Sequence, residues 1–264
     1  MPTFFSIFKT ELYKSFKNKE LFVFLALGIV PVIISFLMWY NHTLDQFQSA
    51  AWMHKDKNPW MFFYQYIYVI EGFLFSFVLI AFVYINIDAE HTAKTWKSIY
   101  SIPKMTRYFL WAKQLALIFW VFVMLQLQYV FIVIATILLQ SVNTAIPYQS
   151  NPAYYGILWL IQLKVLIASL PIIVFQVWFN ALIPKNILIN LLILILSWFL
   201  YSKYLPHSEL IIVCFKTFFY DIKRLMFLES FHLITFTESY SMLWVVIISV
   251  IGYFITPKII DKLT

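Results

Sequence analysis

Residues 21–40 read LFVFLALGIVPVIISFLMWY, a run of twenty residues without a charged side chain. A transmembrane helix needs about 20 predominantly apolar residues to cross the hydrocarbon core of a bilayer. Five further stretches of this kind follow along the chain, at 62–87, 115–139, 155–181, 187–205 and 240–255. Lipid offers no partner to unsatisfied backbone groups, and no stretch alternates as barrel strands do, so we expect six helices. The sequence therefore predicts an all-α polytopic membrane protein with six transmembrane helices, forming one transmembrane domain over residues 1–264.

The composition excludes a water-soluble protein. Residues of the AVILMFWYC class make up 62% of the 264 residues and charged residues 12%, against roughly 45–50% and 25% in soluble domains. A soluble fold of this length has no interior large enough to bury so much apolar side chain. The net charge of +7 could indicate nucleic acid. In so apolar a chain it favours the anionic inner leaflet, so we expect membrane lipid and no nucleic acid as a partner.

Basic residues set the orientation, because cytoplasmic loops of membrane proteins carry an excess of Lys and Arg. With the N-terminus inside, the inner segments hold twelve Lys and Arg residues and the outer segments hold six. We therefore expect both termini in the cytoplasm.

The segment 207–238 predicts a re-entrant or interfacial helical hairpin on the outer side, before the last span. Its two apolar runs, 210–220 and 225–236, are separated by the charged stretch 221–224. Each run is too short to cross the membrane. If one of them did cross, the chain would have seven spans and its C-terminal lysines would lie outside, so we prefer six.

The first 18 residues predict an amphipathic elbow helix. Its apolar residues fall within roughly a 120° arc of a helix, and they are Phe4, Phe5, Phe8, Leu12 and Phe16. We expect this helix, residues 1–18, to lie in the inner interface of the membrane before the first span. The alternative is a frayed basic start.

The cytoplasmic loop at residues 88–103 reads DAEHTAKTWKSIYSIP and predicts a second amphipathic helix, over about 88–100. Asp88 and Glu90 lie in its first turn, where the helix dipole favours negative charge, and Glu90 is spaced to pair with Lys94. Pro103 ends the run. Such a helix is suited to contacting a cytoplasmic partner, with Trp96 as the anchor. The alternative is that Trp96 packs on the lipid headgroups.

No catalytic, metal or nucleotide site is predicted. The four glycines are isolated, so neither GxxxxGK[ST] nor GxGxxG occurs, and any ATP must be hydrolysed by another polypeptide. The single cysteine, Cys214, excludes a multi-cysteine metal site. The five histidines do not cluster at helical spacing, and no Ser/His/Asp set or carboxylate pair is present. We expect no enzyme activity and no cofactor in this chain.

Two ionisable side chains, Glu71 and Lys164, fall within predicted spans at similar depth. Each costs about 2.5–3.5 kcal/mol at the centre of a transmembrane helix on insertion scales, so each is expected to face protein or water rather than lipid. Their matched depth permits a pair or a shared polar cavity. The alternative is that Lys164 extends along its span to the outer headgroups.

Three stretches of the chain resemble type-2 ABC exporter permeases. The loop carries Glu90-His91, Trp96-Lys97 and Ile102-Pro103, followed by Arg107 and Lys113. The other two are Asn58-Pro59-Trp60-Met61-Phe62-Phe63-Tyr64 and Leu170-Pro171, with Phe175-Gln176, Trp178 and Pro184-Lys185-Asn186 beyond it. They are similar to the lantibiotic-immunity branch, whose members expel antimicrobial peptides from the membrane. The resemblance covers about residues 1–200, and residues 207–264 match no motif of the family.

This resemblance implies a permease subunit in a bacterial inner membrane. It implies that the loop is a coupling helix on a separate ATPase subunit, which binds ATP and Mg, and that two permeases form a homo- or heterodimer. The coupling residues would be Asp88, Glu90, His91, Lys94, Trp96 and Lys97. The expected substrate is an amphipathic molecule. The preferred candidate is an antimicrobial peptide, and the alternative is a lipid or glycolipid. A non-transporting membrane anchor or sensor, or an intramembrane enzyme, is a further alternative.

Overall fold

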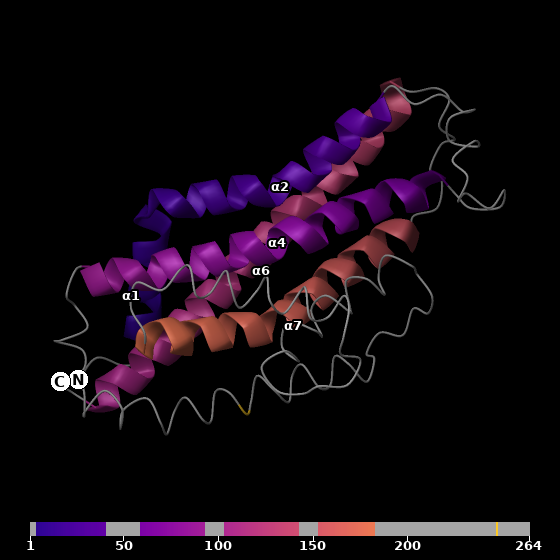
Figure 1. Ribbon diagram of the computed structural model, residues 1–264. Helices are drawn as coiled ribbons and strands as arrows, with labels where there is room; N and C mark the ends of the chain where they lie inside the picture. Colours follow the sequence, from indigo (N-terminus) through magenta and orange to yellow (C-terminus); the bar gives the residue numbers. More distant parts are fainter. Residues whose placement is uncertain (1–3, 41–58, 93–102, 143–152, 183–246, 248–264) are drawn as a thin grey trace, which may run out of the picture.

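The structure is a computed structural model that describes residues 4–40, 59–92, 103–142, 153–182 and 247. The described part of the chain is helical throughout, apart from a break at Asn18. Its helices are α1 (Phe4–Lys17), α2 (Lys19–Tyr40), α4 (Pro59–Thr92), α6 (Pro103–Val142) and α7 (Ala153–Leu182). Helices α2, α4, α6 and α7 form one elongated bundle, and α1 runs across the direction of α2 at one end of it (Figure 1).

Three of the described helices are long and apolar enough to cross a membrane, over Lys19–Tyr40, Tyr108–Val142 and Leu158–Asn180. They correspond to the predicted first, third and fourth spans, and α4 contains the predicted second span, 62–87. With 40 residues, α6 is about 60 Å long, roughly twice the thickness of the hydrocarbon core. The fifth and sixth spans and the outer segment 207–238 lie outside the described residues, so the number of six spans stays a prediction.

Asn18 separates α1 from α2 and caps the second helix. Its side-chain Oδ1 accepts a hydrogen bond from the backbone N–H of Glu20 at 3.3 Å, and its carbonyl accepts one from Leu21 at 3.2 Å. Asparagine is a preferred N-cap because its side chain satisfies a backbone donor that the first helical turn leaves open. Glu20 also places an acidic side chain in that turn, where the helix dipole favours negative charge.

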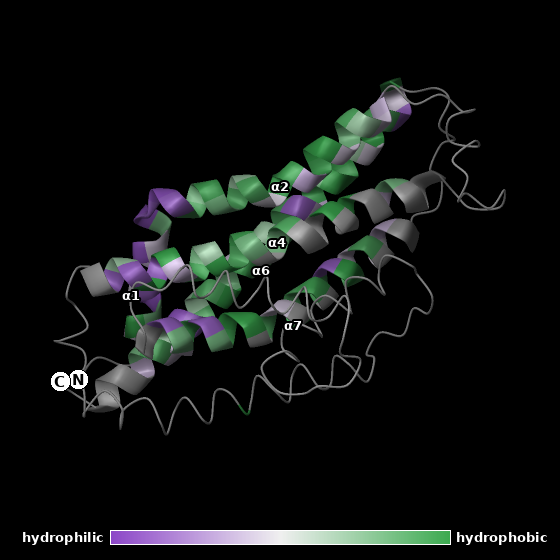
Figure 2. Ribbon diagram, in the orientation of Figure 1, coloured by the Kyte–Doolittle hydropathy of each residue, from purple (hydrophilic) through white to green (hydrophobic). Residues whose placement is uncertain are grey.

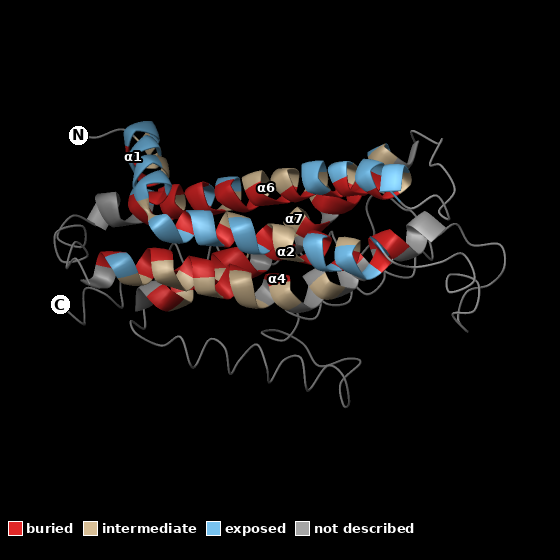
Figure 3. Ribbon diagram, turned by 90° about the horizontal axis from the view of Figure 1, so that it is seen from above, coloured by how far each residue is buried: buried red, intermediate tan, exposed pale blue. Residues whose placement is uncertain are grey.

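The bundle packs around aromatic and aliphatic side chains that its helices share. Both α2 and α7 pack on α4 and α6, and the rings of Phe24 and Phe82 stack with centroids 3.9 Å apart. Buried faces point between the helices, whereas exposed faces point outward (Figure 3). Many exposed residues of α2 and α6 are themselves apolar, among them Phe22, Leu37, Phe119 and Ile137. An apolar exterior over an apolar interior is what a bilayer requires.

Polar side chains connect some of these helices. Trp159 on α7 donates from Nε1 to Oε1 of Gln126 on α6 at 3.1 Å, and the hydroxyls of Tyr64 and Thr136 lie 3.4 Å apart between α4 and α6. Hydrogen bonds of this kind hold helices together where lipid supplies no hydrophobic driving force.

Candidate functional site

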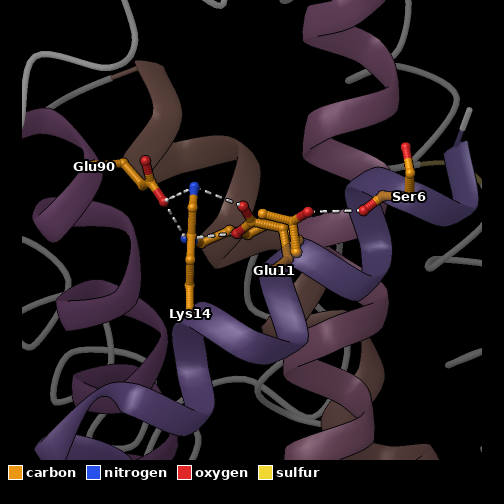
Figure 4. Close-up of polar contacts among 6 residues, drawn as sticks. Ser6, Glu11, Lys14 and Glu90 are labelled. Carbon is orange, nitrogen blue, oxygen red and sulfur yellow. Dashed lines mark hydrogen bonds and ion pairs between the residues drawn. The ribbon is translucent and has the colours of Figure 1, made fainter. Parts of the chain in front are cut away.

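Four charged side chains from three helices meet at the end of the bundle that holds α1 (Figure 4). Lys113 Nζ on α6 lies 3.2 Å from Glu11 Oε2 on α1 and 3.3 Å from Glu90 Oε1 on α4. Lys14 Nζ on α1 lies 3.0 Å from Glu11 Oε1 and 3.1 Å from the same oxygen of Glu90. We call Glu11, Lys14, Glu90 and Lys113 the charged cluster. Each lysine contacts both carboxylates, so the cluster joins α1, α4 and α6.

The sequence of α1 explains how Glu11 reaches the charged cluster. Ile7, Glu11 and Ser15 are buried, and their spacing of four residues puts them on one face of the helix. Helix α1 packs along α6, so Glu11 is directed toward the helix that carries Lys113. Aromatic side chains on the opposite side of α1 are exposed, with Phe5 72% and Phe16 56% exposed. Hydrophilic residues gather at this end of the bundle (Figure 2).

The cluster is mostly removed from solvent. The side chains of Glu11, Glu90 and Lys113 are 2%, 9% and 6% exposed, and only Lys14 is open, at 46%. Two carboxylates and two ammonium groups leave the set formally neutral, which is the condition under which buried charges are tolerated. The Phe109 ring lies 5.6 Å from Lys14 Nζ and 5.8 Å from Lys113 Nζ, within the range of cation–π attraction.

Burial and charge act in opposite directions on Lys14. Burial alone would lower the pKa of its ammonium group, but the carboxylates of Glu11 and Glu90 outweigh it and raise the pKa above the ordinary 10.5. Lys14 therefore stays charged throughout the physiological pH range. The stabilisation that it contributes is present at neutral pH and is lost only as the pH rises through this raised pKa.

The predicted coupling residues divide between α4 and residues outside the described part of the chain. Helix α4 continues without a break through Asp88 and Glu90 to Thr92, and Pro103 begins α6. The side chain of Glu90 is buried and contacts lysines of α1 and α6, and its predicted pairing with Lys94 stays a prediction. The side chain of His91 and all of Lys94, Trp96 and Lys97 lie outside the described residues. The role of the six residues in coupling stays a prediction.

The predicted intramembrane charges lie on helices that pack together. Glu71 is on α4 and Lys164 on α7, and these two helices are in contact. Neither side chain is among those that the structure describes, so their pairing stays a prediction. Within the described residues, no three His, Cys, Asp or Glu side chains gather as metal ligands would.

Sequence reasoning identified Glu90 but not its partners. Glu11 and Lys113 are far from it along the chain, and Glu90 has a sequence neighbour, Lys94, that satisfies the helical pairing rule equally well. One signal was available. Glu11 is an acidic residue on a basic helix, it shares a helix face with Ile7 and Ser15, and it precedes Lys14 by three residues, the spacing of a helical ion pair.

A comparison with protein families places the chain among known membrane proteins. A family model described as ABC-2 family transporter protein matches residues 7–197. That range contains nearly all of α1, the whole of the other described helices, and the loop predicted to couple to an ATPase. No curated protein and no solved structure matches the chain.

Proposed function

The chain belongs to the ABC-2 family of transporter proteins, and we propose that it is the permease subunit of an ATP-driven exporter. A separate ATPase subunit supplies the nucleotide chemistry, and two permease subunits assemble over two ATPases. The single observation that carries the proposal is the family match over residues 7–197. The helices long enough to cross a membrane and the absence of a nucleotide-binding loop from the sequence support it.

The charged cluster suggests how a push from the ATPase would reach the membrane. Glu90 lies two residues before the end of α4, next to the loop on which the ATPase would press. Because Glu90 contacts Lys14 on α1 and Lys113 on α6, a displacement of this end of α4 would pull on both helices. The cluster would therefore move α1, α4 and α6 as one unit rather than letting the loop move alone.

The proposed substrate is an amphipathic molecule that partitions into the membrane, and an antimicrobial peptide is the preferred candidate. Resemblance of the loop and two other stretches to the lantibiotic-immunity permeases supports this choice. A lipid or glycolipid is the alternative, because the same architecture serves such substrates in related permeases. Glu71 and Lys164 are proposed to line a polar cavity between α4 and α7, since charges within spans favour protein or water over lipid.

Export of a fluorescent lantibiotic from living cells tests the substrate. Cells that express the chain with its ATPase should retain less membrane-bound peptide than cells whose ATPase carries a substituted Walker lysine. A fluorescent phospholipid followed in the same cells should show no difference. Glu71→Gln should reduce peptide release while the complex still assembles. Movement of the phospholipid instead of the peptide would favour the lipid exporter, and movement of neither would favour a membrane anchor or sensor.

A further inference from the structure

The first membrane-spanning helix contains a buried proline. Pro31 lies inside α2, and α2 changes direction partway along its length (Figure 1). Proline has no backbone N–H, so the carbonyl of the residue four positions earlier, Leu27, loses its helical hydrogen bond. Within a membrane such a carbonyl needs another donor, because lipid provides none.

A buried glutamine on α6 also lacks hydrogen-bond partners. Gln128 is 1% exposed, and neither its amide oxygen nor its amide nitrogen has a hydrogen-bond partner. Buried polar groups are nearly always paired, with protein or with ordered water. Gln128 can donate two hydrogen bonds and accept two, so it could supply what the Leu27 carbonyl lacks.

The packing of α2 on α6 places the Leu27 carbonyl and the Gln128 amide at the same height along the bundle. A Cβ atom on Gly28 would lie 2.6 Å from Cγ of Met124, so the two helices approach closely because position 28 has no side chain. Gln128 follows Met124 by four residues, which is one turn on the same helix face. Helices α2 and α6 run in the same direction (Figure 1). One turn beyond Gly28 on α2 is the region of Pro31.

A small hollow lies at this junction. Its lining consists of Leu27, Gly28 and Pro31 from α2, Leu74, Phe75 and Val78 from α4, and Gln128 from α6. Among the lining residues that the structure describes, Gln128 is the one whose side chain carries a hydrogen-bonding group. The space open to the centre of a water molecule is about 10 Å³, which is room for about one water molecule.

We propose that α2, α4 and α6 enclose a binding site for one water molecule, which bridges the Gln128 amide and the Leu27 carbonyl oxygen. The site meets the two requirements of an internal water, polar partners and sufficient room. Its consequence is a hydrated bend in α2, because the bridging water lets the helix change its angle at Pro31 without exposing a bare carbonyl to lipid. This proposal does not depend on the substrate or on the ATPase.

The site is tested by the direction in which one substitution shifts the melting temperature of the purified chain. Gln128→Leu removes a partner of the water and should lower the melting temperature by about 2–4 °C. If Gln128 were simply an unpaired polar group, the same substitution would leave the melting temperature unchanged or raise it. Gln162→Leu is the matched control, because Gln162 on α7 is equally buried and unpaired but does not line the hollow. It should not lower the melting temperature.

A double-mutant cycle and a high-resolution map complete the test. Pro31→Ala restores the N–H that bonds the Leu27 carbonyl, so Gln128→Leu should lower the melting temperature less in that background. Additive effects would overturn the proposal. The map should show a water peak within hydrogen-bonding distance of the Gln128 amide and the Leu27 carbonyl, without any transported molecule present. A dry hollow, or a peak found only with a transported molecule, would also overturn it.

Discussion

Lys113 holds the charged cluster together, since it contacts both carboxylates while being 6% exposed itself. Lys14 makes similar contacts from a half-open position. The two lysines therefore differ in how much each contributes to the free energy of unfolding. Removing the buried one leaves carboxylates without their buried cation, whereas removing the open one lets water approach the site.

This difference predicts the outcome of two substitutions. Lys113→Met should lower the free energy of unfolding by about 3–5 kcal/mol, because it leaves buried charge uncompensated. Lys14→Met should lower it by about 1 kcal/mol or less, as exposed ion pairs do. Thermal or denaturant unfolding of the detergent-solubilised chain measures both, with Lys9→Met, an exposed lysine of α1, as control. Adding Glu11→Gln to Lys113→Met should restore part of the loss. Equal effects of Lys113→Met and Lys9→Met would contradict the cluster's role.

At the scale of elements, the apolar runs and the amphipathic first residues predicted the helices that the structure describes. The predicted helix over residues 1–18 is present as α1, and spans one, three and four correspond to candidate membrane helices. The face that α1 buries could not be predicted, because its aromatic arc dominates the sequence pattern. The buried face follows instead from tertiary pairing with Lys113, which local rules do not contain.

The continuation of α4 through Glu90 was also outside the reach of local rules. Asp88 and Glu90 favour a helix start by the local rule, and the lysines of α1 and α6 that compensate Glu90 near the end of the longer helix come from distant parts of the chain. The coupling prediction therefore depends on the side chains beyond Thr92, and above all on Trp96.

Trp96→Ala should leave the permease folded and inserted but weaken its association with the ATPase. A large aromatic side chain at an interface is a frequent hot spot, so the loss should be about 2 kcal/mol or more, roughly 30-fold in affinity. Titration of the purified ATPase against permease in nanodiscs measures it. Trp96→Phe should retain most of the affinity. If Trp96→Ala binds as the unmodified chain does, Trp96 is an interfacial anchor for lipid instead.

For the whole molecule, composition alone was sufficient to place the chain in a membrane, because no soluble interior could hold so much apolar side chain. The arrangement of helices was not predictable from it. Contacts of α2 and α7 with both α4 and α6 depend on details such as Gly28, which permits close approach to Met124. The burial of Gln128 likewise depends on which helices become neighbours.

The predicted orientation can be tested with single cysteines, because the chain has one native cysteine, Cys214. In a Cys214→Ser background, Lys57→Cys should react with a membrane-impermeant maleimide in intact cells, since residue 57 is expected outside. Lys97→Cys should react only after the cells are opened. Labelling of both in intact cells, or of Lys97→Cys alone, would refute the expectation that both termini are cytoplasmic.

ATP hydrolysis by the partner subunit tests the central claim, that this chain is the permease of an ABC transporter, most directly. The chain should be co-expressed with a Walker-motif ATPase encoded beside its gene, affinity-purified and reconstituted in nanodiscs. The account predicts that the ATPase co-purifies and that its turnover depends on the permease. Turnover should fall when the cluster is broken by Glu90→Gln, while Lys9→Gln has no effect. An ATPase that does not co-purify, or that hydrolyses ATP equally well without this chain, would contradict the account.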